Sequence, residues 1–223
     1  MGRRSIGKGK GGIAVLRIYT IGVESAAASI LLLPAMWTVL EGCRRNMTVV
    51  RRLMLMLLAV YFCGVCSATG LPTMVNMRFA PRFNLIPLVD VVNDPPAYLC
   101  NTLLNLLLFV PFGFFAPLLW RQLRSGLRTA AAGLFYSAAI EVAQMFSGRL
   151  TDVDDLIVNT AGALIGYLLA KFVYRRVAVR WQLHFTGQQL ESGGSSLNGL
   201  VGLAVLCTMV MYFVRPFAER LFC

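Results

Sequence analysis

Apolar runs alternate with short polar segments along most of the chain. The runs cover about residues 16–40, 53–71, 101–120, 127–146, 155–173 and 198–214. Each is close to the roughly 20 residues that an α-helix needs to cross a bilayer. The pattern therefore predicts an all-α polytopic membrane bundle of about six transmembrane helices, without a second, soluble domain.

The segments between the runs predict the rest of the organisation. Residues 1–15 are expected to be a basic disordered tail, and 16–49 an extra N-terminal helix with its loop. Residues 50–175 form the main membrane domain, 176–197 a polar linker, and 198–223 an extra C-terminal helix and tail. Within the main domain, 72–99 carries five prolines and is expected to be irregular.

Basic residues are unevenly distributed among the loops. The first, third and fifth loops are basic, whereas the second and fourth carry aspartates that balance their arginines. By the positive-inside rule, the basic loops are cytoplasmic and the other two face outward. The basic N-terminal tail conflicts with six spans, since it would also lie outside. Either the tail is translocated or the first run does not fully cross.

Composition narrows the class of protein further. Of the 223 residues, 57% are hydrophobic and 14% are charged, and the formal net charge is +11. Because the basic residues flank apolar runs, they are expected to meet lipid headgroups rather than nucleic acid. The six cysteines form no disulfide or zinc pattern. With His184 as its single histidine, the chain cannot build a histidine-based metal site or triad.

Polar side chains gather near the predicted outer ends of three helices. Ser137, Glu141 and Gln144 share one face of the fourth run, by their helical spacing. Asn101 and Asn105 do so at the start of the third run. Ionisable groups within apolar helices are costly and are functional candidates, so Glu141 is the strongest of them.

The fifth run completes the predicted pocket. Asp155 and Asn159 are four residues apart near its start, and Gly162 and Gly166 continue that face as a small-residue packing seam. The preceding loop contributes Arg149, Asp152 and Asp154. We therefore expect an outward polar pocket. Each residue also has a structural alternative: Asp152 as a helix cap, Arg149 in a salt bridge, and the amides in interhelical packing.

These positions resemble a known family. Phe83-Asn84-Leu85-Ile86-Pro87-Leu88 is similar to the N-L-I-P segment of VanZ-like proteins. The spacing of Asn101, Asn105, Phe109, Pro111 and Gly113 resembles that family's second block. The third block is matched from Glu141 to Gly166. The resemblance covers about residues 50–175 and implies a VanZ-like four-helix core in a bacterial cell membrane, with Asn84 joining the pocket. The family's namesake lowers susceptibility to teicoplanin.

Four functions fit these patterns. A binding protein of the cell envelope would hold a lipid-linked precursor or an amphiphilic antibiotic. A membrane-embedded enzyme would use Glu141 as acid or base, with Mg²⁺ or Ca²⁺ on the loop acids as its only conceivable cofactor. No nucleophile motif supports catalysis. A transporter lacks polar groups in the inner halves of the helices, and a purely structural bundle would act through a partner. Membrane lipids are expected partners, nucleic acid is not, and the oligomeric state stays open.

Overall fold

The computed structural model describes residues 7–43, 47–84, 95–181 and 197–222. Six long helices account for most of them: α1 (Gly7–Cys43), α2 (Val49–Ala68), α4 (Pro95–Leu119), α5 (Gly126–Gln144), α6 (Val153–Trp181) and α7 (Leu197–Phe222). A short 3-10 helix, η1 (Arg121–Leu123), and two strands, β1 (Arg82–Asn84) and β2 (Leu150–Asp152), complete the described elements. The predicted all-α membrane bundle is confirmed.

Five of these helices are long and apolar enough to cross a membrane. They are α1, α2, α4, α6 and α7, and their candidate spans are 20 to 27 residues long. The remaining helix, α5, has 19 residues and does not belong to this group. One face of α5 is polar, which lowers the mean hydropathy of the helix. The side chains of this face are buried by the rest of the bundle; they include Thr129, Ser137, Glu141 and Gln144.

Several helices extend beyond the boundaries that the sequence predicted. Residues 7–15 are helical rather than a disordered tail, since propagating an existing helix adds one hydrogen bond per residue. Helix α4 starts at Pro95, inside the predicted irregular loop, because proline is tolerated in the first helical turn. Helix α6 runs to Trp181, into the predicted linker. Helix α7 passes through Pro216 to Phe222.

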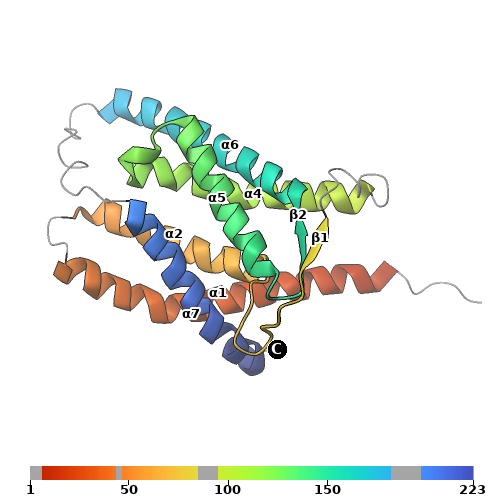
Figure 1. Ribbon diagram of the computed structural model, residues 1–223. Helices are drawn as coiled ribbons and strands as arrows, with labels where there is room; N and C mark the ends of the chain where they lie inside the picture. Colours follow the sequence, from red (N-terminus) through yellow and green to blue (C-terminus); the bar gives the residue numbers. More distant parts are fainter. Residues whose placement is uncertain (1–6, 44–46, 85–94, 182–196, 223) are drawn as a thin grey trace, which may run out of the picture.

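The bundle has two groups of three helices. Helices α4, α5 and α6 lie together on one side, and α1, α2 and α7 on the other (Figure 1). An aromatic cluster joins the groups, where Phe62 of α2 contacts Tyr136 of α5, which stacks on Phe112 of α4. The hydroxyl of Tyr61 also donates to the carbonyl of Leu108, at 2.9 Å. Helix α2 therefore connects the outer pair, α1 and α7, to the rest.

Helices α4 and α6 approach each other at glycine. A Cβ added to Gly162 would overlap the carbonyl oxygen of Leu106, and one added to Gly166 would overlap that of Val110. Gly113 on α4 faces the backbone of Ala163 in the same way. At the predicted packing positions Gly162 and Gly166, the backbone of α6 therefore lies directly against the backbone of α4. This contact fixes the first half of α6 against the middle of α4.

A buried ion pair holds α1 and α7 to the end of α2. Glu24 of α1 is 2% exposed and accepts hydrogen bonds from Ser67 of α2 and, at 2.8 Å, from Nε of Arg215 of α7. The Nη1 atom of Arg215 also donates to the carbonyl of Leu71, at 2.7 Å. Each charge is thereby compensated, as a buried pair in a membrane helix requires.

Replacing Gly166 by alanine should destabilise the bundle. The new methyl group meets the backbone of α4, and overpacking of this kind costs about 1–3 kcal/mol. Thermal unfolding of the detergent-solubilised protein would then begin several degrees lower, at about 2–4 °C per kcal/mol. Gly22→Ala is the matched control, because a Cβ there meets nothing within 4 Å. Equal midpoints for the two variants would contradict the close approach.

Removing one partner of the buried pair should cost more than removing both. Arg215→Met leaves the Glu24 carboxylate uncompensated, which costs about 3–5 kcal/mol. In the double variant Glu24→Leu/Arg215→Met we expect part of this loss to be recovered, since no buried charge is then left. Arg220→Met changes an exposed arginine of the same helix and serves as the control. If the double variant lost as much unfolding free energy as the two single variants together, Glu24 and Arg215 would not interact.

Candidate functional site

The site lies at the end of the bundle where α2 and α5 end and where α4 and α6 begin; we call this the site end. Strand β1 pairs in parallel with β2 here, and Asn84 stands opposite Asp152. The amide nitrogen of Asn84 also donates to Asp152 Oδ2, at 3.3 Å. This pairing, which the sequence did not predict, brings Asn84 into the site from a segment far away in the chain.

Glu141 is held below this pair of strands. Its side chain is 4% exposed, and Oε2 accepts a hydrogen bond of 3.1 Å from the backbone N–H of Asp152. The hydroxyl of Thr151 lies 3.4 Å from the Glu141 carbonyl oxygen. The carboxylate therefore anchors β2 to the last turn of α5. Ser137 and Gln144 are buried on the same face, as the spacing predicted.

The aspartates surround the first turn of α6. Asp152 Oδ1 accepts from the N–H of Asp154, at 3.0 Å, and so caps the helix. Asp155 accepts from the amide of Asn105 on α4, at 2.5 Å, and Asp154 accepts from the hydroxyl of Tyr98, at 3.4 Å. Negative charge near a helix N-terminus is favourable. Structural roles therefore account for part of this acidic group.

Two buried amides retain unused hydrogen-bonding capacity. Asn159 donates to the Ser137 hydroxyl, at 2.8 Å, and Gln144 donates to the carbonyl of Thr69, also at 2.8 Å. Their amide oxygens are buried and have no partner within the described residues. Whichever way each amide is turned, one polar atom remains to be satisfied. These atoms offer acceptor or donor positions to a ligand or to water.

The end of α2 supplies the other half of the site. Gly70 adopts a positive φ of 63°. The N–H of Leu71 donates to Cys66 O and that of Gly70 to Ser67 O, which is the Schellman pattern for a helix C-terminus. Three further carbonyls remain, and each receives a side chain: Ala68 from Arg17, Thr69 from Arg149 and Gln144, and Leu71 from Arg215.

Arg149 lies between the carbonyls of α2 and the acids of α6. Its Nη1 donates to Thr69 O, at 2.5 Å, and no carboxylate among the described residues lies within 4 Å of its guanidinium. Burial, together with the neighbouring Arg17, lowers the pKa of Arg149, whereas Asp155 and Glu141 act in the opposite direction. An arginine stays protonated nevertheless. The salt bridge that the sequence offered as a structural alternative for Arg149 is therefore not formed among the described residues.

The structure brings most of the predicted residues together. Asn101 differs: it is exposed, one turn before Asn105, and no hydrogen bond of its side chain is seen within the described residues. Leu85, Ile86, Pro87 and Leu88 of the N-L-I-P segment lie outside the described residues, as does His184. The acids do not gather into a group of three or more that could hold a metal ion, within the part of the chain that is described.

The sequence did not place three contributors in the site: Arg17, Gly70 and Arg215. Gly70 followed by Pro72 is a typical signal for the end of a helix, and it could have located the cap. The charge of Glu24 within the first apolar run, and that of Arg215 directly after the sixth, could have suggested a pair. Nothing local indicates that Arg17 reaches the carbonyl of Ala68, because that contact depends on how α1 lies against α2.

Comparison with known proteins gives one match. The family model described as VanZ/LLP1 matches residues 52–174, from α2 to α6. No curated protein and no solved structure matches the chain. The matched segment contains Asn84, Asn105, Glu141, Arg149, the three aspartates and Asn159, whereas α1 and α7 lie outside it. Since the match covers more than half of the sequence, this multi-pass membrane protein belongs to the VanZ/LLP1 family.

Proposed function

We propose that the site end binds the phosphorylated sugar headgroup of a lipid-linked precursor of the bacterial cell envelope, on the extracytoplasmic side of the membrane. The observation that carries the proposal is the state of Arg149. It is fixed by one hydrogen bond to Thr69 O and has no carboxylate partner among the described residues. Its remaining N–H groups suit the oxygens of a phosphate.

A neighbouring arginine adds to this attraction. Arg17 donates to the carbonyl of Ala68, next to Thr69, so a second guanidinium group lies at the end of α2. Arg215 also donates there, to Leu71, but Glu24 compensates its charge. Guanidinium groups recognise phosphate by paired hydrogen bonds as well as by charge. A phosphate or diphosphate would therefore occupy the side of the site formed by α2 and Arg149.

The opposite side of the site suits sugar hydroxyl groups. The carboxylates of Asp152, Asp154 and Asp155 accept hydrogen bonds, and hydroxyl groups donate them. The unsatisfied amide oxygen of Asn159 provides a further position there, and that of Gln144 lies next to Thr69, between the two sides. A ligand with a phosphate at one end and hydroxyls at the other matches a site with arginines on one side and acids on the other.

The lipid portion of this ligand has an apolar surface to follow. Leu99, Leu103 and Leu107 are exposed along α4, the helix that also carries Asn105. A chain attached to the phosphate would run down such a face into the bilayer. An amphiphilic glycopeptide antibiotic such as teicoplanin combines an apolar chain with a polar body, and it would compete for the same site. This competition would connect the protein to antibiotic susceptibility.

Replacing Arg149 by lysine should weaken binding of a polyprenyl diphosphate that carries one sugar. Lysine keeps the charge but loses the planar fork. Losing one charge-assisted hydrogen bond, about 1.5–3 kcal/mol, predicts a decrease in affinity of about ten- to a hundredfold. Native mass spectrometry of the detergent-extracted protein measures this directly.

Two controls accompany that measurement. Arg128→Lys makes the same change at an exposed arginine at the other end of the bundle, and it should leave affinity unchanged. The corresponding polyprenyl alcohol lacks phosphate, so both variants should bind it weakly and equally. If Arg149→Lys bound the diphosphate as well as the wild type does, the phosphate-binding role would be lost.

The membrane side can be tested with two single cysteines. Leu150 is 48% exposed at the site end, and Gln122 is exposed in η1 at the opposite end. In a background with Cys43→Ser, Cys100→Ser and Cys223→Ser, a membrane-impermeant maleimide should label Leu150→Cys in intact cells. Gln122→Cys should react only after lysis. The reverse pattern would place the site in the cytoplasm and exclude an extracytoplasmic ligand.

A further inference from the structure

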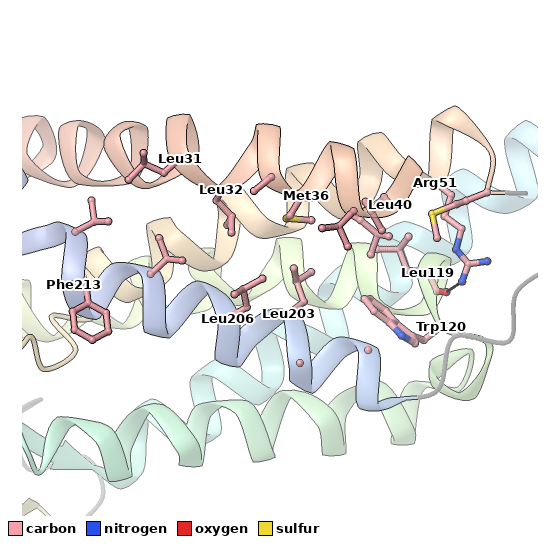
Figure 2. Close-up of a pocket in the computed structure, with 18 residues that line it drawn as sticks. Leu31, Leu32, Met36, Leu40, Arg51, Leu119, Trp120, Leu203, Leu206 and Phe213 are labelled. Atoms are coloured by element: carbon pink, nitrogen blue, oxygen red, sulfur yellow. Dashed lines mark hydrogen bonds between the residues drawn. The ribbon is translucent and has the colours of Figure 1, made fainter. Parts of the chain in front are cut away.

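A long apolar groove lies between α1 and α7, and its end at Arg51 and Trp120 is at the opposite end of the bundle from the site end. Its volume is about 700 Å³, within the usual range for a small-molecule pocket. Leu32, Met36 and Leu203 form its buried floor, while Leu31 and Phe213 stand exposed along its edges (Figure 2). The two helices diverge from each other toward the end that holds Arg51 and Trp120 (Figure 2). The groove is therefore open along the face that lipid would cover.

The Trp120 end of the groove is polar, although the rest is apolar. The Trp120 side chain is 1% exposed, yet its indole N–H has no hydrogen-bond partner within the described residues. A buried donor without a partner costs free energy. Arg51 lies beside it and donates to the carbonyl of Leu119, at 3.3 Å. Gly199 faces the indole nitrogen without a side chain to cover it.

We propose that this groove holds one acyl chain of an anionic phospholipid, with the phosphate at the Arg51 and Trp120 end. The indole N–H and the guanidinium group would donate to the phosphate oxygens, and the acyl chain would lie over Leu203 toward Phe213. Nothing in this inference depends on the ligand of the site end, because Arg51 and Trp120 lie at the opposite end of the bundle and the groove shares no lining residue with the site.

The dimensions of the groove fit a lipid of one leaflet. Its lining positions on α7 run from Gly199 to Val214, which is about 22 Å at 1.5 Å per residue. That is more than half of a hydrocarbon core of roughly 30 Å. An acyl chain that starts near Trp120 would therefore reach the middle of the bilayer without leaving the groove.

The charge at this end favours an anionic lipid over a neutral one. Arg51 and Arg52 follow each other at the start of α2, and the guanidinium of Arg52 lies 5.8 Å from the ring of Trp37. Arg121 lies in η1, Arg124 directly after it, and Arg128 in the first turn of α5. Each basic residue near a membrane surface contributes about 1 kcal/mol of attraction toward anionic lipid. Phosphatidylglycerol is the simplest lipid with the required charge.

Filling the groove should displace this lipid. A Cβ on Gly202 meets nothing within 4 Å, so Gly202→Phe would place a ring in the groove without a clash against the backbone. After delipidation, the full-length protein would be titrated with phosphatidylglycerol or with phosphatidylcholine of identical chains, and bound lipid counted by native mass spectrometry. We expect about tenfold weaker binding of phosphatidylglycerol to Gly202→Phe, by loss of an apolar contact worth about 1.4 kcal/mol. Gly22→Phe, an equal change on an open face of α1, should bind as the wild type does.

The headgroup contacts are tested separately. Trp120→Phe keeps an aromatic ring but removes the donor, and Arg51→Gln removes the charge. Each should weaken phosphatidylglycerol about tenfold, the value for a hydrogen bond to a charged group. Trp120→Phe should weaken phosphatidylcholine by a similar factor, because both lipids carry the phosphate, whereas Arg51→Gln should weaken phosphatidylcholine less, because its choline cation leaves it without net charge. Equal binding of the two lipids by the wild type would overturn the proposal, as would equal effects of Gly202→Phe and Gly22→Phe. A lipid-free dimer that Gly202→Phe dissociates would assign the groove to a second copy instead.

Discussion

Backbone carbonyl groups at the end of a helix need donors, and at the end of α2 these come from α1, from α5 and the turn after it, and from α7. The Schellman turn at Gly70 satisfies the carbonyls of Cys66 and Ser67. Those of Ala68, Thr69 and Leu71 are left to Arg17 of α1, to Arg149 and Gln144, and to Arg215 of α7. The contact of Arg215 with Leu71 is buried, so losing it would leave a carbonyl without a donor and would be expensive. The end of α2 is thus the point at which the two groups of helices are joined.

This arrangement has a consequence for the candidate site. A side chain that stabilises a carbonyl is held in place before any ligand arrives, so little conformational entropy remains to be lost on binding. Arg149 is fixed by Thr69 O, and Gly70 leaves space for it, since a Cβ there would contact Nη1 at 2.5 Å. Glu141 is fixed by the N–H of Asp152 in the same way. The site is therefore preorganised by the same hydrogen bonds that hold the fold together.

The sequence predicted the helices and most of the site because both depend on local spacing. Ser137, Glu141 and Gln144 share a face because their spacing matches the helical period. Two glycines four residues apart, Gly162 and Gly166, indicate a close contact between helices. The pairing of Asn84 with Asp152 could not be predicted, since two three-residue strands carry too little pattern to show that they meet. The exposure of Asn101 depends on the rotation of α4, which its contact with α6 determines. The sequence also predicted that the last helix ends near Arg215, because its ion pair with Glu24, far away in the chain, could not be foreseen.

The two helices outside the matched family segment are integrated into the structure rather than attached to it. Helices α1 and α7 contribute Arg17 and Arg215 to the carbonyls of α2, and their ion pair closes the bundle at the site end. Because this pair draws them together at that end, they are free to diverge toward the other, where the groove opens beside Trp120. One interaction thereby accounts for both features. A change that loosens Glu24 from Arg215 would disturb the polar site and alter the shape of the groove, although the two share no residue.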